Sequence, residues 1–327
     1  MDLKSEQITS APKPELFSEF VYFQLVSDNN YNRFEVDALT NEQLKKLANF
    51  SENIESPFIL GKFNNENHYL DTLVLVLSST HETHNRVSFI LNEILPGLPE
   101  HGSLLDVGPG DGTLTNAVAH KFKHITLIDV NHHALHNLQK RLAPSTHIEQ
   151  ISTSISNVEL PSEQYNLAIL SHMLYYIEPE SWLTVITSAY NSLKNNGVLV
   201  AIMGGDELGK SELIKHFGGQ TLEIDQLATQ CCNTFGVANV DLFASNESFI
   251  ACTKEAMLHI SAFMLADANI VASKDDLIRY ITQNFKKSDS YFEMTTKQKY
   301  IIIKKNNYLR DEIHGINQFF VDNQSKN

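Results

Sequence analysis

The sequence lacks the long apolar runs and the basic charge that membrane and nucleic-acid proteins carry. Its longest unbroken apolar run extends from Leu73 to Leu77, whereas a helix that spans a bilayer needs about 20 such residues. The first thirty residues hold no apolar segment of the secretory kind. Acidic residues outnumber basic ones by 39 to 25, which gives a formal net charge of −14, and such a surface does not neutralise phosphates. We therefore expect no membrane association and no nucleic-acid partner.

Cysteine is also scarce in this chain of 327 residues. The three cysteines are Cys231, Cys232 and Cys252; they form no CxxC pair, and an odd number argues against a disulfide framework. This pattern favours a reducing cytoplasm, and we interpret the three thiols as core residues.

Histidine is frequent, with 14 residues, yet neither of the two densest clusters predicts a metal site. HETHN at 81–85 departs from the zinc-binding HExxH pattern because its fifth residue is Asn85. His132 and His136 share a helix face but lack a third ligand nearby, so we interpret them as a solvated surface. We expect no resident metal.

The two ends of the chain differ in composition from its centre. Residues 1–66 form an acidic extension with several prolines, in which we expect a helix after Thr40 and a short strand at 21–27. Residues 67–98 contain two amphipathic helices, the second of which ends at Pro96 and Gly97. A polar tail occupies 306–327.

Between these ends, short apolar segments alternate with amphipathic ones. The expected strands are 103–107, 124–130, 147–152, 165–171 and 197–203. The helices between them are 114–122, 132–142 and 180–194, the last ended by Asn195, Asn196 and Gly197. This alternation predicts a parallel sheet covered on both faces, a doubly wound α/β domain. In 204–305 we expect further helices at 211–216, 225–235, 256–264 and 274–285, and strands at 240–245 and 299–304.

The turn after the first expected strand carries the most specific motif, LDVGPGDG at 105–112. Without a Cβ, Gly108, Gly110 and Gly112 can adopt positive φ and let the backbone approach a ligand. Dinucleotide sites use GxGxxG, whereas the spacing here is GxGxG, and Asp106 ends the strand before it. A carboxylate at this position disfavours a pyrophosphate and favours a cation.

A second acid, Asp129, ends the next expected strand. A carboxylate at that position can accept hydrogen bonds from both hydroxyls of a ribose. One acid for a cationic group, a glycine turn beneath a sugar and one acid for its hydroxyls together indicate S-adenosylmethionine.

With these motifs the sequence resembles the class I S-adenosylmethionine-dependent methyltransferases, and more narrowly histamine N-methyltransferase and its relatives. The narrower resemblance rests on NHYLDTLVLVLSSTHETHN and ILPGL within 67–98, SHMLYYIEP at 171–179, KHFG at 215–218 and KYIIIK at 299–304. It implies a seven-stranded, mostly parallel sheet, in which 240–245 and 299–304 supply the last two strands. The cofactor-binding half is expected at 103–203 and the substrate side in 67–98 and 204–305.

The resemblance also implies roles for individual residues. Cofactor contacts are implied at Gly108, Asp129, Ser156 and Ser171, and a substrate-binding carboxylate at Glu82. Between the two tyrosines that follow the fourth strand, the resemblance assigns Tyr176 to the site. A carboxylate at Glu82 suits an amine or imidazole acceptor, because both carry a positive charge when protonated.

The chain also departs from the histamine enzyme in its substrate pocket. His172 replaces a glutamine, Thr296 replaces an asparagine, and Lys210 and Ile214 replace two pocket tryptophans. These changes put histamine itself in doubt and favour an acceptor that carries a carboxylate as well as an amine.

Methyl transfer from a sulfonium needs an aligned nitrogen lone pair and no metal. The expected function is therefore N-methylation of a small amine or imidazole, with Glu82 or His172 taking up the proton and the ring of Tyr176 stabilising positive charge. Two alternatives stay open. One is transfer to oxygen or carbon with His172 as the base, and the other is a non-catalytic cofactor-binding module that engages a protein partner.

Overall fold

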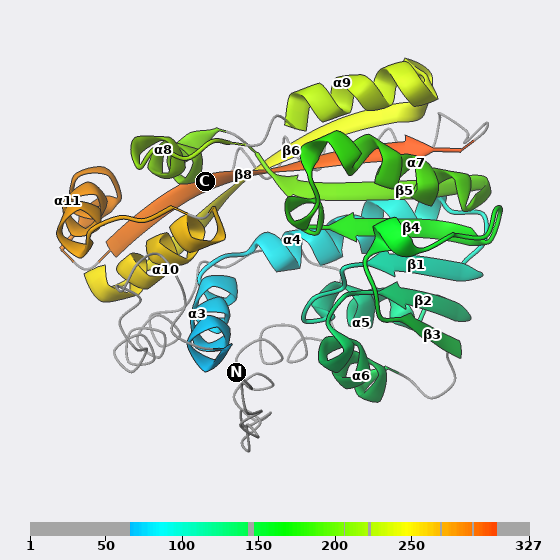
Figure 1. Ribbon diagram of the computed structural model, residues 1–327, viewed down its shortest axis with the longest axis horizontal. Coiled ribbons are helices and arrows are strands. Elements are labelled where there is room, and N and C mark those ends of the chain that lie inside the picture. Colours follow the sequence, from blue (N-terminus) through cyan, green and yellow to red (C-terminus); the bar gives the residue numbers. More distant parts are fainter. Residues whose placement is uncertain are drawn as a thin grey trace, which may run out of the picture. The chain divides into compact units, whose positions relative to one another are not determined.

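A computed structural model describes residues 66–142, 147–205, 207–221, 224–268, 270–289 and 291–305 (Figure 1). The described residues fall into two compact units. The first consists of 66–81, 212–220 and 248–295, and the second of 82–211, 221–247 and 296–305. The predictions made for the extension before residue 66, including the helix after Thr40 and the strand at 21–27, lie outside the described residues, as does the tail.

A sheet ordered β3-β2-β1-β4-β5-β8-β6 forms the centre of the fold. Its first strands are parallel: β1 (Ser103–Val107), β2 (His124–Ile128), β3 (His147–Ile151), β4 (Tyr165–Ser171) and β5 (Leu193–Gly204). Strand β8 (Tyr291–Lys304) pairs antiparallel with β5 and opposes Val200 with Ile302. The predicted doubly wound, mostly parallel sheet with an antiparallel last strand is therefore confirmed.

Two apolar cores cover the faces of this sheet, because neighbouring residues of a strand point to opposite sides. Leu104 of β1 packs in one core with helices α4 (Glu82–Phe89), α5 (Thr113–Ala119) and α6 (His132–Arg141). Leu105 packs in the other with α7 (Trp182–Asn191) and α9 (Ile224–Phe235). Helices on both faces are what makes the strands read as continuous apolar runs.

The predicted end of the helix at 180–194 is wrong. Helix α7 ends at Asn191, and Leu193 already begins β5, where it pairs with Tyr165. The pairing resumes at Val198 after a shift of register, and Asn196 has a φ of 63°. Burial of Leu193 in the core and its pairing outweigh the helical pattern, so Asn195, Asn196 and Gly197 form an irregularity in the strand rather than a helix cap.

The two strands predicted after residue 204 exist but are longer than expected. They are β6 (Val240–Ala251) and β8, and a third strand, β7 (Lys286–Ser288), pairs with the start of β8. Strand β7 escaped prediction because its three residues are exposed lysines and a serine, which give no apolar alternation. The four predicted helices correspond to α8 (Leu208–His216), α9, α10 (Lys254–Asp267) and α11 (Lys274–Asn284).

The first unit has a core of its own. Helices α3 (Glu66–Ser78), α10 and α11 contribute Leu75, Met257 and Ile281, and the first part of β8 contributes Phe292. Among the described residues, every helix is too short or too polar to reach across a bilayer.

The second predicted amphipathic helix consists of three pieces. Helix α4 continues as a π-helical turn, Ile90–Ile94, and then as a 3-10 turn, Leu95–Gly97. The predicted stop at Pro96 and Gly97 is confirmed. Helix α4 matters for the site because Glu82 is its first residue.

Candidate functional site

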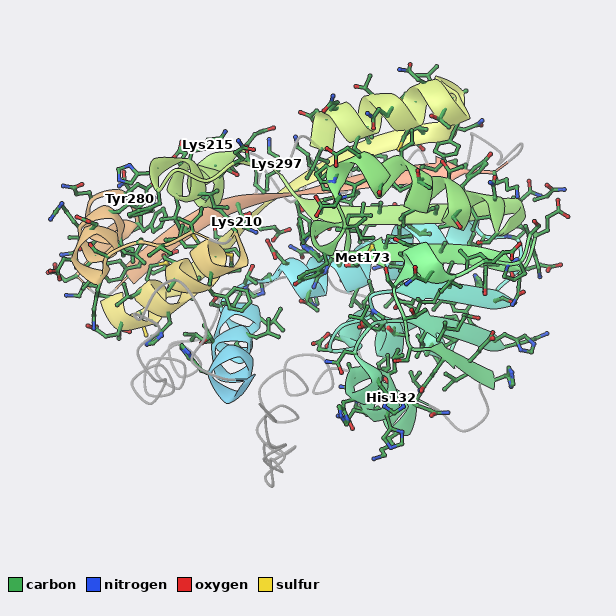
Figure 2. The ribbon with its side chains drawn as sticks, viewed as in Figure 1. His132, Met173, Lys210, Lys215, Tyr280 and Lys297 are labelled. Carbon is green, nitrogen blue, oxygen red and sulfur yellow. The ribbon has the colours of Figure 1, made fainter. Side chains whose placement is uncertain are left out.

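The glycine turn between β1 and α5 has the predicted backbone conformation. Gly108, Gly110 and Gly112 have φ angles of 67°, 57° and 72°. A Cβ on Gly108 would lie 2.6 Å from the Cβ of Met173, which is marked in Figure 2, and one on Gly112 would overlap Leu138. A Cβ on Gly110 would meet nothing within 4 Å. Packing therefore requires the outer two glycines, whereas Gly110 borders open space from which a ligand can approach.

Asp106 lies beneath this turn, with only 2% of its surface exposed. Its Oδ2 accepts a hydrogen bond of 2.5 Å from Thr115 Oγ1 and so ties β1 to α5. Burial raises the pKa of the Asp106 carboxyl to about 7, the Thr115 hydrogen bond opposes that shift, and the negative charge of Asp129 adds to it. A cation next to this carboxyl would relieve the cost of its charge.

The other predicted cofactor residues follow the carboxyl ends of neighbouring parallel strands. Asp129 follows β2, is half-buried and accepts a hydrogen bond of 2.8 Å from the Asn131 backbone. Ser171 ends β4 and is half-buried, whereas Ser156 is exposed in a 3-10 turn after β3. Because these strand ends meet at one edge of the sheet, the structure brings the three residues to the same edge as Gly110.

This edge fits the expected cofactor. It offers two carboxyl groups, one buried and one half-buried, and open space over a glycine with positive φ. A sulfonium and ammonium suit the acids, and the open turn admits a sugar.

His172 follows β4 directly and has a left-handed backbone with a φ of 53°. Its Nε2 lies 3.2 Å from the amide nitrogen of Gln298, and its Nδ1 lies 3.1 Å from Tyr175 Oη. Because the amide nitrogen can only donate, Nε2 accepts, and Nδ1 carries the hydrogen donated to Tyr175. Tyr300 donates to Gln298 Oε1, and the Gly204 N–H donates to Tyr175 Oη. These hydrogen bonds form one chain across β8, the loop after β4 and the end of β5.

The surroundings of His172 keep its imidazole neutral. Burial lowers its pKa well below 6.5, and the positive charges of Arg86 and Lys210 lower it further. Such an imidazole takes up a proton weakly at neutral pH. The geometry therefore favours His172 as a hydrogen-bonding residue over His172 as a base.

Glu82 is 9% exposed and lies near a second buried acid, Glu247 of β6, which is 6% exposed. Asn85, one turn after Glu82, donates to both carboxylate oxygens of Glu247 at 2.9 and 2.8 Å. Ser245 Oγ donates to Glu247 Oε1 at 2.8 Å. Burial raises the pKa of Glu247 to about 7; the Asn85 hydrogen bond lowers it, and the Glu82 charge raises it.

Helix α4 covers one face of β6 and β8. The ring of Phe89 lies 4.7 Å from that of Tyr300 and 6.1 Å from that of Phe243, measured between centroids. Alternation along β8 places Thr296 on the same face as Gln298 and Tyr300. The Thr296 side chain is fully buried, and within the described part of the chain its hydroxyl has no hydrogen-bond partner. The predicted residues Glu82, His172 and Thr296 thus belong to one region.

The two tyrosines after β4 differ in their surroundings. Tyr176 is 73% exposed, while Tyr175 is half-buried and holds the hydroxyl contacts with His172 and Gly204. The role expected for Tyr176 stays a prediction. A Cβ on Gly204 would lie 3.2 Å from Tyr175 Oη and 3.4 Å from Lys210 Nζ, so Lys210 also borders this region.

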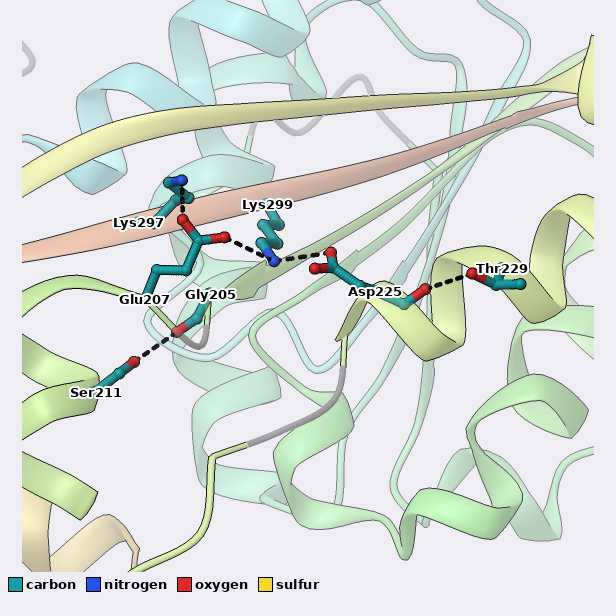
Figure 3. A network of polar contacts seen from close by, with 7 residues as sticks. All are labelled: Gly205, Glu207, Ser211, Asp225, Thr229, Lys297 and Lys299. Atoms are coloured by element: carbon teal, nitrogen blue, oxygen red, sulfur yellow. Dashed lines mark hydrogen bonds and ion pairs between the residues drawn. The ribbon is translucent and has the colours of Figure 1, made fainter.

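An ion-pair network fixes the segment that carries Lys210 (Figure 3). Glu207 pairs with Lys297, and Lys299 bridges Glu207 at 3.4 Å and Asp225 at 2.8 Å. Ser211 Oγ donates to the Gly205 carbonyl at 3.1 Å. Hydrogen bonding to Lys297 lowers the pKa of Glu207. These contacts attach the segment to β8 and to the start of α9.

The histidines of α6 and the buried cysteine do not lie in surroundings typical of metal or redox sites. His132 and His136 are exposed on α6 with parallel rings 6.4 Å apart, and His132 points away from the sheet (Figure 2). Cys231 is buried, which raises the pKa of its thiol to about 12. Within the described ranges, no three His, Cys, Asp or Glu side chains are grouped to hold a metal ion.

Comparison with known families gives a match to the family described as a methyltransferase domain, over residues 104–197. Residues 104–197 are a methyltransferase domain. The strand order, with β8 antiparallel, is that of the class I methyltransferases which the sequence resembles and whose cofactor is S-adenosylmethionine.

Similar curated proteins are uncharacterized methyltransferases of Mycobacterium bovis and Mycobacterium tuberculosis, each 28% identical over 106 residues. The alignment covers 28% of this chain and 53% of each relative, so the chain spans about half the length of the curated relatives it matches.

Similar solved structures have low sequence identity. A putative methyltransferase of Bacillus halodurans has a TM-score of 0.48 at 12% identity and covers 68% of this chain and 100% of its own. The N-methyltransferase NodS of Bradyrhizobium japonicum has a TM-score of 0.37 at 16% identity, with 68% and 96% covered.

Proposed function

We propose that this protein transfers a methyl group from S-adenosylmethionine to a nitrogen of a small amine or imidazole. The observation that carries the proposal is the pair of buried acids, Glu82 and Glu247, in one region with the fully buried Thr296 hydroxyl. Buried carboxylates are costly unless they are paired or hydrogen-bonded. Arg86 supplies one positive charge near these two acids, and a protonated amine or imidazole supplies a second, whereas an alcohol or a carbon acceptor does not.

The cofactor is assigned to the edge formed by the glycine turn. Asp129 would accept hydrogen bonds from the ribose hydroxyls, and Asp106 would lie near the cationic end. The backbone at Gly108 and Gly110 would lie beneath the sugar, with Ser156 and Ser171 at its sides.

S-adenosylmethionine, when bound, supplies a methyl group on a sulfonium that a nitrogen lone pair can displace in line. Glu82 takes the proton from the acceptor nitrogen and frees that lone pair. Thr296 and the hydroxyl of Tyr175 orient the acceptor, and Tyr176 shields the site from water. Holding the reactants in line is itself worth several orders of magnitude in rate. Once the acceptor nitrogen is methylated, Glu82 would release the proton to solvent and return to its ionised form.

Lys210 and Arg86 add positive charge near His172. We therefore extend the proposal to acceptors that carry a carboxylate beside the amine, such as amino acids. We also propose that the protein works in the cytoplasm, where its three cysteines would stay reduced.

A screen with labelled S-adenosylmethionine against imidazoles, amines and amino acids tests the proposal. We expect label in an N-methyl product, identified by mass and by NMR, and binding of S-adenosylmethionine but not NADH by calorimetry. Label only on oxygen or carbon would contradict the nitrogen acceptor. Cofactor binding without turnover on any compound would instead favour the non-catalytic module.

A further inference from the structure

Glu247 is a buried acid that is held by several hydrogen bonds. Its two carboxylate oxygens receive three hydrogen bonds, two from the Asn85 amide and one from the Ser245 hydroxyl. Asn85 belongs to α4 and Ser245 to β6, and 162 positions separate Asn85 from Glu247 in the chain. This arrangement fixes the carboxylate in one orientation next to the first turn of α4.

Glu82 occupies that first turn, and residues three apart on a helix lie on the same face. The Asn85 amide therefore holds the Glu247 carboxylate on the face of α4 that also carries Glu82. Several other groups act on these two acids or face them: Arg86 from α4, Tyr300 from β8, and His172 from the loop after β4. His172 is neutral and Tyr300 carries an uncharged hydroxyl, so Arg86 is the positively charged group among these three.

An independent observation indicates that a ligand belongs here. The Thr296 hydroxyl is fully buried and lacks a hydrogen-bond partner among the described residues, on the β8 face that also carries Gln298 and Tyr300. A buried hydroxyl without a partner costs free energy. A bound acceptor with a polar group would satisfy it.

We propose that Glu247 is a positioning residue of the acceptor site, which holds Asn85 and the first turn of α4 so that Glu82 faces the cationic nitrogen of the acceptor. The inference rests on the proposed function. Two neighbouring carboxyl groups resist carrying two negative charges, and the Glu82 charge raises the pKa of Glu247. Entry of a protonated acceptor balances the second charge, and the proton passes from nitrogen to Glu82 before the freed lone pair forms the N–C bond.

The first experiment requires no acceptor. The full chain, labelled with carboxyl-¹³C glutamate, is titrated by infrared spectroscopy, and the label separates glutamate bands from that of Asp106. We expect a buried glutamic acid band that disappears as the pH rises through about 7, that is missing in Glu247→Gln, and that titrates at lower pH in Glu82→Gln. An unchanged titration in Glu82→Gln would refute the coupling.

The second experiment follows the rate of methylation against pH, with the acceptor found in the screen and imidazole as a fixed probe. In Glu247→Gln we expect the part of the pH profile that follows Glu247 near pH 7 to disappear and kcat to fall about tenfold, because Asn85 loses its charged partner. Glu247→Asp should restore most of the wild-type profile. Glu293→Gln is the matched control, because Glu293 on β8 also accepts a hydrogen bond from a serine of β6, Ser248, at 2.7 Å.

Affinity for S-adenosylmethionine, measured by calorimetry, should be the same in all variants, which shows that they are folded. A Glu247→Gln protein with the wild-type pH profile would overturn the inference and leave the proposed function intact. A wild-type protein that methylates no nitrogen compound would instead remove the proposed function, while the infrared titration still decides whether the two acids are coupled.

Discussion

Asp106→Asn should make the protein more stable at pH 8, although it changes a residue of the cofactor edge. The carboxyl of Asp106 has its pKa raised to about 7 in the folded chain, from 3.8. When the pKa of an acid rises on folding, ionisation of that acid at high pH lowers the stability of the native state. As the pH rises from about 4 to about 7, the unfolded chain gives up this proton first, so folding stability falls over that window.

The size of the effect follows from the shift. A difference of about 3 pKa units at 1.36 kcal/mol each corresponds to about 4 kcal/mol at pH 8. The asparagine is neutral at every pH, and its carbonyl still accepts from Thr115. We therefore expect Asp106→Asn to raise the free energy of unfolding by about 2 to 4 kcal/mol at pH 8 and to change it by less than about 1 kcal/mol at pH 4.

Urea unfolding followed by tryptophan fluorescence measures this difference. Trp182 is the one tryptophan of the chain and is buried on α7, with its Nε1 donating to the carbonyls of Leu174 and Ile177, so it reports on the second unit. Asp129→Asn, at the end of the neighbouring strand, is the control. It should change the free energy of unfolding by less than about 1 kcal/mol at both pH 4 and pH 8. An Asp106→Asn protein that is less stable than wild type at pH 8 would refute the reasoning.

Four further predictions concern the site. Glu82→Gln should abolish turnover and leave the cofactor Kd within about threefold in calorimetry, because we propose that this side chain contacts the acceptor and not the cofactor; equal turnover would remove Glu82 from the mechanism. Asp129→Ala should weaken cofactor binding by about tenfold to a hundredfold through loss of charge-assisted hydrogen bonds, and an unchanged Kd would contradict the ribose assignment. Gly110→Ala should cost about 1 kcal/mol of stability in urea unfolding, since an L-residue is strained at its positive φ. Cofactor affinity of wild type should rise with pH between 6 and 8, because a bound cation lowers the pKa of Asp106; a flat profile would separate that carboxyl from the cofactor.

The sequence predicts best those parts of the fold in which a single local pattern determines the secondary structure. Strands β1 and β4 have the predicted bounds because their residues are buried on both faces, and the alternate glycines at 108–112 leave little choice of backbone. The start of β5 was misread because Leu193 follows a helical pattern in sequence but is held by pairing with a distant strand.

The acceptor side depends on contacts that no local pattern records. Glu247 escaped notice because β6 was expected to end at residue 245, and its partner Asn85 lies on a helix far away in the chain. Gln298 directly precedes the strand expected at 299–304, so its contact with His172 was not foreseen. The segment LYY predicted a tyrosine near the site, but the choice between Tyr175 and Tyr176 depends on which one the loop turns inward.

The hydrogen-bond chain through His172 links positions that must change together in evolution. Its donors all run one way, from Tyr300 through the Gln298 amide to the imidazole and on to Tyr175. A relative that replaces the amide at 298 loses the group that fixes the imidazole tautomer, so position 172 should then no longer be histidine. The identities of residues 172, 298 and 300 should therefore covary across an alignment. Thr296 takes no part in these hydrogen bonds, so residue 296 should vary independently, with the acceptor.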